Sequence, residues 1–228
     1  MQFHAGLLAG GLAGCAAISV VSACGSGTTA EPSAAALATS MQQAVRRADS
    51  VHFSGQQSAH GVPVGINTGI HRSGELSGMI TENGAKLQVL AVGGKLFIKA
   101  TPEFLKQVKA PANSCSIVCG RWIQLPPQEA KQLTGQLTMD NLTGDVASAK
   151  LPKFTEHGTT TVDGQPAWVL RAPNGAVVDV SAIGTPYPLR ATPGGSSHAV
   201  IKYSQWNSVP KPVAPPASQV INLNGLGR

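Results

Sequence analysis

The spacing of apolar residues over residues 34–49 predicts an amphipathic helix. These residues recur at intervals of three and four, which places them on one face of a helix. They are Leu37, Met41, Val45 and Ala48. Glutamine and arginine fill the opposite face, so we expect a single apolar stripe to pack against the rest of the fold.

After this helix the pattern changes to short β-prone runs separated by glycine, which is typical of a strand meander. The runs occupy residues 50–74, 74–84, 85–94 and 95–100. The dipeptides Asn83-Gly84 and Gly93-Gly94 favour hairpin turns between neighbouring strands. We therefore expect about four antiparallel strands in this region.

Helical signals interrupt the strands in the middle of the chain. Thr101 is a suitable cap and Pro102 a suitable first residue for a short helix over residues 101–108. A brief strand is expected over residues 121–125. Two prolines then open a helical stretch over residues 126–142, which a glycine interrupts.

Strand patterns return between Phe154 and Asn207. The expected turns are Asp163-Gly164, Asn174-Gly175 and Gly194-Gly195. The proline-rich tail over residues 209–218 is expected to be an extended edge or surface segment. The two groups of strands look like two halves of one curved antiparallel sheet, so the predicted fold class is α+β with a few helices.

Composition agrees with a turn-rich β protein. Only 12% of the 228 residues are charged and 4% are aromatic, whereas glycine occurs 26 times and proline 16 times. The expected helices are dominated by alanine and glutamine, although a packed core needs leucine, isoleucine and phenylalanine at higher density. Either loops complete the core, or the sheet keeps an apolar cavity, which is by default a ligand site.

The formal net charge of +6 does not indicate nucleic acid as a partner. The basic residues are scattered singly apart from Arg46-Arg47, and no basic run is interleaved with aromatic residues. Weak attraction to anionic lipid headgroups or to an acidic wall polymer fits this distribution better.

The start of the chain has the pattern of a secretory signal. Residues 3–23 carry no charge apart from His4 and are rich in glycine, alanine and valine. The segment Val21-Ser22-Ala23-Cys24 resembles the lipobox of bacterial lipoproteins. This resemblance implies a signal peptide over residues 1–23 and a diacylglyceryl group, with acyl chains such as palmitate, on Cys24.

Residues 24–33 are predicted to be a flexible tether of small polar residues. Two acyl chains give stable anchoring, so this reading places the protein on the outer face of the cell membrane. Leu12-Ala13-Gly14-Cys15 matches the same pattern, and Cys15 stays an alternative lipidation site. An uncleaved anchor helix is a second alternative, and in each case the body lies outside the cytoplasmic membrane.

Cys115 and Cys119 are the two remaining cysteines of the chain. Outside the cytoplasm a nearby pair is most often a disulfide, which is our prediction here. A C-x3-C pair also occurs in some copper-handling proteins of thioredoxin-like fold. That alternative requires further ligands, and no histidine or methionine lies close in the sequence.

The sequence lacks the usual arrangements of catalytic residues. The acidic residues are dispersed, no GxSxG elbow is present, and the glycine pairs are not followed by the GK[ST] of a phosphate loop. Three histidines lie between glycine-rich turns without metal-ligand spacing; they are His52, His60 and His71. We predict neither an enzyme nor a bound cofactor or metal.

Large apolar residues on the expected strands are candidates for the lining of a ligand cavity. They are Met79, Ile80, Leu87, Val89, Leu96, Ile98, Trp122, Trp168, Leu170 and Val178. As ordinary core residues they need no further explanation, because strand alternation already places some of them inside. Candidates for contact with a ligand headgroup are Lys86, Lys95 and Lys99. Trp206 is expected either as core or as a brace at a strand end, with its indole N–H bonded to the backbone.

Ordered segments along the chain resemble a known family. The segments are RRADSVHFSG, VGGKLFIKA, GRWIQLP, GTPYPLRA and IKYSQWNSVPKPVAPPAS. Together with the lipobox they resemble actinobacterial lipoproteins of the LppX/LprG type, which share a half-barrel with LolA and LolB. The resemblance implies a strongly curved antiparallel sheet wrapped over helices around a hydrophobic cavity that binds acyl chains. It implies no catalytic residues.

The resulting hypothesis is a single domain over residues 34–228 that binds a lipid or glycolipid and carries or presents it in the cell envelope. The alternative is a non-catalytic interaction protein of the same fold that docks on a membrane-bound regulator or a wall component. An open apolar interior favours the carrier, whereas a filled interior favours the docking protein.

Overall fold

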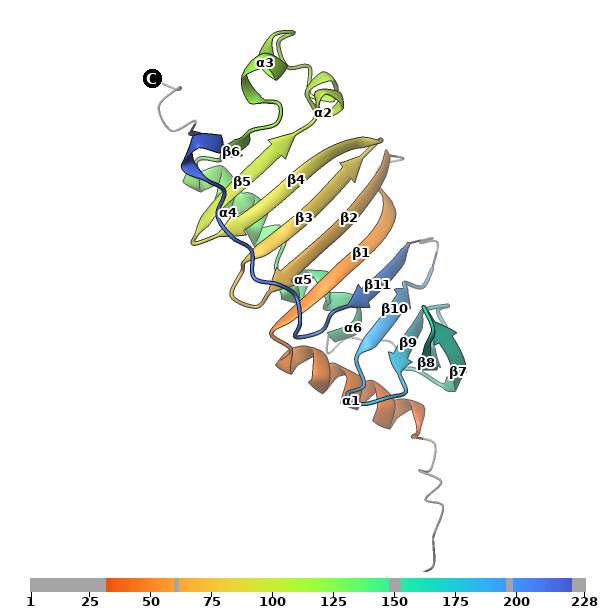
Figure 1. Ribbon diagram of the computed structural model, residues 1–228. Coiled ribbons are helices and arrows are strands. Elements are labelled where there is room, and N and C mark those ends of the chain that lie inside the picture. Colours follow the sequence, from red (N-terminus) through yellow and green to blue (C-terminus); the bar gives the residue numbers. More distant parts are fainter. Residues whose placement is uncertain (1–31, 60–61, 148–152, 196–198, 223–228) are drawn as a thin grey trace, which may run out of the picture. The chain divides into compact units, whose positions relative to one another are not determined.

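A computed structural model describes residues 32–59, 62–147, 153–195 and 199–222 (Figure 1). Contacts divide the chain into two units, residues 1–31 and residues 32–228, and the second is described here by itself. The predicted signal peptide, the tether, and the lipidation sites Cys24 and Cys15 lie outside the described residues, as does His60. No helix in the described ranges is long and apolar enough to cross a membrane.

The strands of the described residues form one sheet in the order β12-β6-β5-β4-β3-β2-β1-β11-β10-β9-β8-β7. The first group comprises β1 (Ser50–Ala59), β2 (Val62–His71), β3 (Leu76–Glu82), β4 (Ala85–Val92), β5 (Lys95–Ala100) and β6 (Trp122–Gln124). The second comprises β7 (Glu156–Val162), β8 (Gln165–Arg171), β9 (Val177–Ser181), β10 (Pro188–Thr192) and β11 (Val200–Ser204). The last strand is β12 (Val220–Asn222).

The pairing of β1 with β11 joins the two groups into one curved, open sheet (Figure 1). Every neighbouring pair is antiparallel except β12 and β6, which are parallel. The predicted α+β class and the curved antiparallel sheet are therefore confirmed. Hairpin turns lie at the predicted dipeptides between β3 and β4, between β4 and β5, and between β7 and β8.

The helices are α1 (Ala34–Arg47), α2 (Pro102–Gln107), α3 (Ser114–Val118), α4 (Pro127–Gln136), α5 (Met139–Leu142) and α6 (Gly144–Ala147), with a 3-10 turn at Ala217–Gln219. Ser33 caps α1 by accepting a hydrogen bond from the amide of Ala36, and Leu37, Met41 and Val45 are buried as the apolar stripe predicts. Thr101 caps α2 in the same way through the amide of Phe104.

The predicted helix over residues 126–142 is two helices, which corrects its extent. α4 ends at Gln136, and the hydroxyl of Thr138 accepts a hydrogen bond from the amide of Asn141 at the start of α5. A threonine that caps a new helix competes with continuation of the old one, because its side chain satisfies the amides of the next turn.

Arg72, in the turn between β2 and β3, fastens helices to one end of the sheet. Its Nε donates to the carbonyl of Ala48 at 2.8 Å, and one terminal nitrogen donates to the carbonyl of Val45 at 3.1 Å. The other terminal nitrogen pairs with Asp140 of α5 at 3.1 Å. A single guanidinium thus caps the end of α1 and holds α5 beside it.

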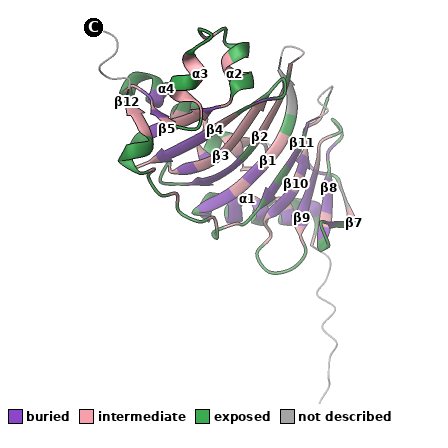
Figure 2. Ribbon diagram, turned by 45° about the horizontal axis from the view of Figure 1, so that its top comes forward, coloured by how far each residue is buried: buried purple, intermediate pink, exposed green. Residues whose placement is uncertain are grey.

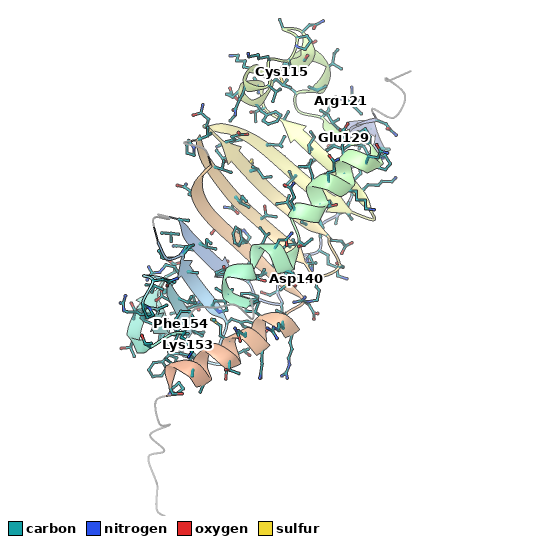
Figure 3. The ribbon with its side chains drawn as sticks, turned by 180° about the vertical axis from the view of Figure 1, so that it is seen from behind. Cys115, Arg121, Glu129, Asp140, Lys153 and Phe154 are labelled. Carbon is teal, nitrogen blue, oxygen red and sulfur yellow. A yellow bond between two sulfur atoms is a disulfide. The ribbon has the colours of Figure 1, made fainter. Side chains whose placement is uncertain are left out.

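We call the face of the sheet that packs on the helices the inner face, and the opposite one the outer face (Figures 1 and 3). The main core lies on the inner face, where buried residues of α1, α4, α5 and α6 meet the strands. Figure 2 shows buried residues along the strands of both halves of the sheet.

The proline-rich tail crosses the outer face as a strap, residues 205–219. The amide of Val209 donates to the hydroxyl of Ser50 at 3.3 Å. A Cβ atom on Gly69 would lie 2.6 Å from Val209, so only glycine leaves room for the strap there. The indole N–H of Trp206 donates to the carbonyl of Pro188 at 2.9 Å, which confirms the bracing role predicted for it. The strap leads into the edge strand β12.

Candidate apolar binding face

Side chains of β11 and β1–β5 form three cross-strand rows on the inner face, because residues paired across a ladder point to the same side. Row one contains Val51, Ile70, Leu76, Ala91 and Leu96. Row two contains Tyr203, Phe53, Thr68, Gly78, Val89 and Ile98. Row three contains Ile201, Gly55, Ile66, Ile80, Leu87 and Ala100.

Burial decreases from row one to row three. Every residue of row one is at most 5% exposed. In row three the side chains of Ile66, Ile80 and Leu87 are only partly buried, although they pack against the core cluster. These three residues are direct ladder neighbours on β2, β3 and β4. They form a continuous, half-exposed apolar strip.

The helices cover the rows unequally. Helix α5 packs against β1 and α4 against β5. α5 is tied by Asp140 to Arg72, which follows β2 at the row-one end. At the row-three end α2 packs against β4, and it begins two residues after Ala100 of row three. Figure 3 views the inner face with α4 and α5 across one end of the strands.

The three rows contain no ionisable acid or base apart from the phenol of Tyr203. This chemistry can bury hydrocarbon, which needs no polar partner, but it supplies no carboxylate or imidazole for proton transfer. Among the described residues, the Oγ1 of Thr68 in row two is buried without a hydrogen-bond partner. Its side chain lies between Phe53 and Gly78 in the row.

Replacing Thr68 by valine is expected to raise the free energy of unfolding by about 1 kcal/mol, because it removes a hydroxyl that is buried without a partner. Thr143 is the matched control, since it is equally buried and its hydroxyl donates to the carbonyl of Met139 at 2.8 Å. Thr143→Val is therefore expected to lower stability. Urea denaturation of both variants measures the difference, and an equal loss in both would contradict the unpaired state of Thr68.

The structure divides the predicted cavity residues among different surroundings. Ile80 and Leu87 lie in row three, Val89 and Ile98 in row two, and Leu96 in the fully covered row one. Three others lie in the second half of the sheet. Leu170 and Val178 are buried in the core there, and Trp168 is partly buried against it.

Met79 and Trp122 lie on the outer face, which corrects their predicted place in the lining. Met79 alternates with Ile80, and Trp122 alternates with Ile123, whose side chain is in the inner core. Both border an outer-face groove that also contacts Pro212 and Val213 of the strap. We therefore exclude them from the candidate face.

The predicted headgroup lysines are also on the outer face. Lys86, Lys95 and Lys99 alternate with inner-face residues along β4 and β5. The Nζ atom of Lys99 lies 5.7 Å from the ring centroid of Trp122, a cation–π contact. None of the three therefore leaves the sheet on the side of the apolar strip.

His52, His71 and the cysteine pair each contact neighbouring groups of the fold. A ring nitrogen of His71 lies 3.3 Å from the carbonyl oxygen of Pro210 in the strap, and one of His52 lies 3.4 Å from the hydroxyl of Ser204. Cys115 and Cys119 form a disulfide, with Cα atoms 4.7 Å apart. In the part of the chain that the structure describes, no three metal-binding side chains come together.

A second groove, of about 730 Å³, opens on the outer face at the far ends of β1 and β2. Its polar lining residues are Ser54, Gln56, Asn67, Thr81 and Lys202. Hydroxyl, amide and ammonium groups would lose hydrogen bonds to water if hydrocarbon covered them. The inner strip is therefore the better candidate for an apolar ligand.

No protein-family model and no curated protein matches the chain. Among solved structures, LprF from Mycobacterium bovis superposes with a TM-score of 0.56 at 13% sequence identity, over 82% of this chain and 97% of LprF. The chain has the LprF fold. Since the superposition spans nearly all of LprF, the likeness extends over the whole fold, and the predicted resemblance to the LppX/LprG type is confirmed as a likeness of fold.

Two more distant structures align with lower scores. MucB in a MucA/MucB complex from Pseudomonas aeruginosa gives a TM-score of 0.31 at 16% identity, over 82% of this chain and 59% of that one. A LolA superfamily protein from Nitrosomonas europaea gives 0.27 at 12% identity, over 80% and 96%. At these scores neither adds to the likeness with LprF.

Proposed function

We propose that this protein binds the acyl chains of a lipid or glycolipid on its inner face and carries or presents that lipid in the cell envelope. The observation that carries the proposal is the half-exposed strip of Ile66, Ile80 and Leu87, which continues an apolar core without any charged group. A concave apolar surface of this kind suits a hydrocarbon ligand. The binding is non-catalytic.

Burial of methylene groups would supply the affinity. Each buried CH₂ is worth about 0.8 kcal/mol, so a chain of ~14 carbons is worth up to ~11 kcal/mol before ordering costs. Such a gain needs no specific polar motif. Selectivity among lipids would then follow from the length of the apolar strip and from the charges at its rim.

The proposal includes an extracytoplasmic location. Cys24, after a signal peptide over residues 1–23, would carry the acyl groups that hold the protein on the outer face of the membrane. A disulfide between Cys115 and Cys119 is compatible with an oxidising compartment. Residues 32–228 form a compact unit by their contacts, so this body is suited to separate expression.

Native mass spectrometry of this body, purified from a lipid-containing envelope, tests the proposal. We expect an added mass of several hundred daltons or more that organic solvent releases and that fragments as a lipid. A control body carrying Ile80→Gln should show the added mass at much lower occupancy. A protein that is free of lipid and takes up neither phospholipid nor glycolipid would refute the carrier function.

The second candidate function is docking on an envelope protein or wall polymer without a lipid cargo. The observation in its favour is the polar groove of about 730 Å³ on the outer face, which contains Lys202 beside amide and hydroxyl groups. Two results together would favour this function. The mass spectrum would show no bound lipid, and the protein would bind a wall polymer with an affinity that the substitution Gln56→Ala lowers.

A further inference from the structure

The insertion between β5 and β6 forms a stapled tip, residues 101–121. It contains α2 and α3, and the disulfide between Cys115 and Cys119 closes the end of α3. Figure 1 shows both helices beyond the ends of β4 and β5, and Figure 3 shows Cys115 and Arg121 at the same end of the sheet. Neither α2 nor α3 has a buried residue, and the disulfide restricts the conformations of this segment.

The tip exposes large apolar side chains. Val108 is 54% exposed and Ile117 is 55% exposed. Burial of these two side chains against another surface would be favourable, because it removes apolar area from water. Neither α2 nor α3 has a fully buried residue. Val118 of α3 packs against the core, whereas Val108 and Ile117 stay exposed and are available for contact.

The charge of the tip is positive. Lys106, Lys109 and Arg121 are exposed, and Glu103 is the one acidic residue, so the net charge of residues 101–121 is 3 − 1 = +2. A hydrogen bond from its own backbone amide and one from the hydroxyl of Thr101 hold the pKa of Glu103 below its usual value. Glu103 therefore belongs to the cap of α2 and stays ionised at neutral pH.

The tip adjoins the apolar strip. Helix α2 follows row three directly along the chain, since Pro102 comes two residues after Ala100, and it packs against β4, the strand that carries Leu87. A surface that touches the tip therefore lies close to the open end of the strip.

We propose that the tip docks on an anionic lipid bilayer, with Val108 and Ile117 entering the headgroup region and the surrounding cations contacting lipid phosphates. Apolar side chains ringed by lysine and arginine bind at this interface because burial and charge attraction add together. The proposal rests on the proposed function, to which it adds the surface from which lipid is taken or to which it is delivered. The occupant is a membrane, because a +2 charge complements its negative surface.

Cosedimentation of the body over residues 32–228 with vesicles tests the proposal. The vesicles are phosphatidylcholine alone, or phosphatidylcholine with about one third phosphatidylglycerol. We expect binding to the anionic vesicles that falls as salt is raised, and much weaker binding to the neutral ones. Equal binding to both compositions, or binding to neither, would overturn the proposal.

Two pairs of substitutions separate the tip from the rest of the surface. Val108→Ser with Ile117→Ser is expected to lower the partition coefficient on anionic vesicles about tenfold. Its matched control is Val213→Ser with Ile183→Ser, which removes a valine and an isoleucine that are 83% and 67% exposed elsewhere. This control is expected to bind as the unsubstituted body does, and an equal loss in both pairs would contradict a specific tip.

The charges are tested in the same way. Lys106→Gln with Lys109→Gln is expected to lower the partition coefficient about 30-fold, since each lysine near an anionic surface contributes roughly fivefold. Lys131→Gln with Lys153→Gln removes the same charge from exposed positions outside the tip and is expected to have a small effect. A larger loss from the second pair would overturn the assignment.

Uptake of a fluorescent fatty acid from detergent-free solution distinguishes this proposal from the proposed function. The tip variants are expected to take up the probe normally from solution but slowly from anionic vesicles. Uptake from solution without any vesicle binding would refute the tip and leave the lipid-binding function standing. Vesicle binding without uptake would refute the lipid-binding function and leave the tip standing.

Discussion

Ile80→Gln is expected to weaken acyl-lipid uptake about 30-fold while the protein stays folded. Ile80 is the central residue of the half-exposed strip, with Ile66 and Leu87 as its ladder neighbours. An acyl chain that covers the strip would have to desolvate the glutamine amide, which costs roughly 2 kcal/mol and corresponds to that factor in the dissociation constant. Because Ile80 is partly exposed, glutamine can keep its amide hydrated in the ligand-free protein, so the loss falls on binding more than on folding.

Met79→Gln is the matched control for this result. Met79 is the preceding residue of the same strand, but its side chain lies on the outer face next to Asn67. Titration of both variants with a fluorescent fatty acid is expected to give normal affinity for Met79→Gln and weak binding for Ile80→Gln, with similar urea midpoints. Greater weakening by Met79→Gln would place the ligand on the outer face instead.

Local signals in the sequence predicted much of the fold. The apolar stripe of Leu37, Met41 and Val45 gave the first helix, because a 3.6-residue period requires no knowledge of distant contacts. Turn dipeptides such as Asn83-Gly84 marked hairpins, because they favour the turn that joins adjacent strands. The expectation that the two strand groups form one curved sheet is confirmed by the pairing of β1 with β11, which the sequence did not predict.

The face of each strand residue could not be predicted with the same success. Alternation separates Met79 from Ile80, but it does not say which of two apolar neighbours points inward. Leu90 and Phe97 show the difficulty, since they are 6% and 4% exposed on the outer face. They border grooves shared with the strap, at Val213 and Pro215, so a distant part of the chain makes the outer face apolar as well.

The apolar tip was missed because its signal is short. Helix α3 has five residues, too few for a hydrophobic period, and it was not predicted. The cysteine pair correctly marked a stapled loop, but exposure of Val108 and Ile117 depends on how far the loop stands from the sheet. The available signal was the combination of two large apolar residues and three cations in a short segment that also contains the cysteine pair.

Gly78→Ala is expected to lower the free energy of unfolding by about 3 kcal/mol. Gly78 lies in row two, where a Cβ atom would approach the Cα and Oγ1 atoms of Thr68 at 2.5 Å and would come closer still to the carbonyl oxygen of Asn67. Backbone atoms of the paired strand cannot rotate away as a flexible side chain can, so β2 and β3 must separate locally. Overpacking of this kind costs between 1 and several kcal/mol.

Gly55→Ala is the matched control, because it tests whether replacing any strand glycine by alanine lowers stability. Gly55 lies in row three, where a Cβ atom would lie 3.4 Å from the carbonyl oxygen of Val200 and 3.6 Å from a side-chain carbon of Ile201, which are ordinary contacts. Alanine there also restricts the unfolded chain, so we expect a change in stability within about 0.5 kcal/mol. Urea denaturation measures both variants, and similar midpoints would mean that β2 and β3 do not approach as closely as described. A large loss from Gly78→Ala alone would establish the close approach of β2 and β3 at row two.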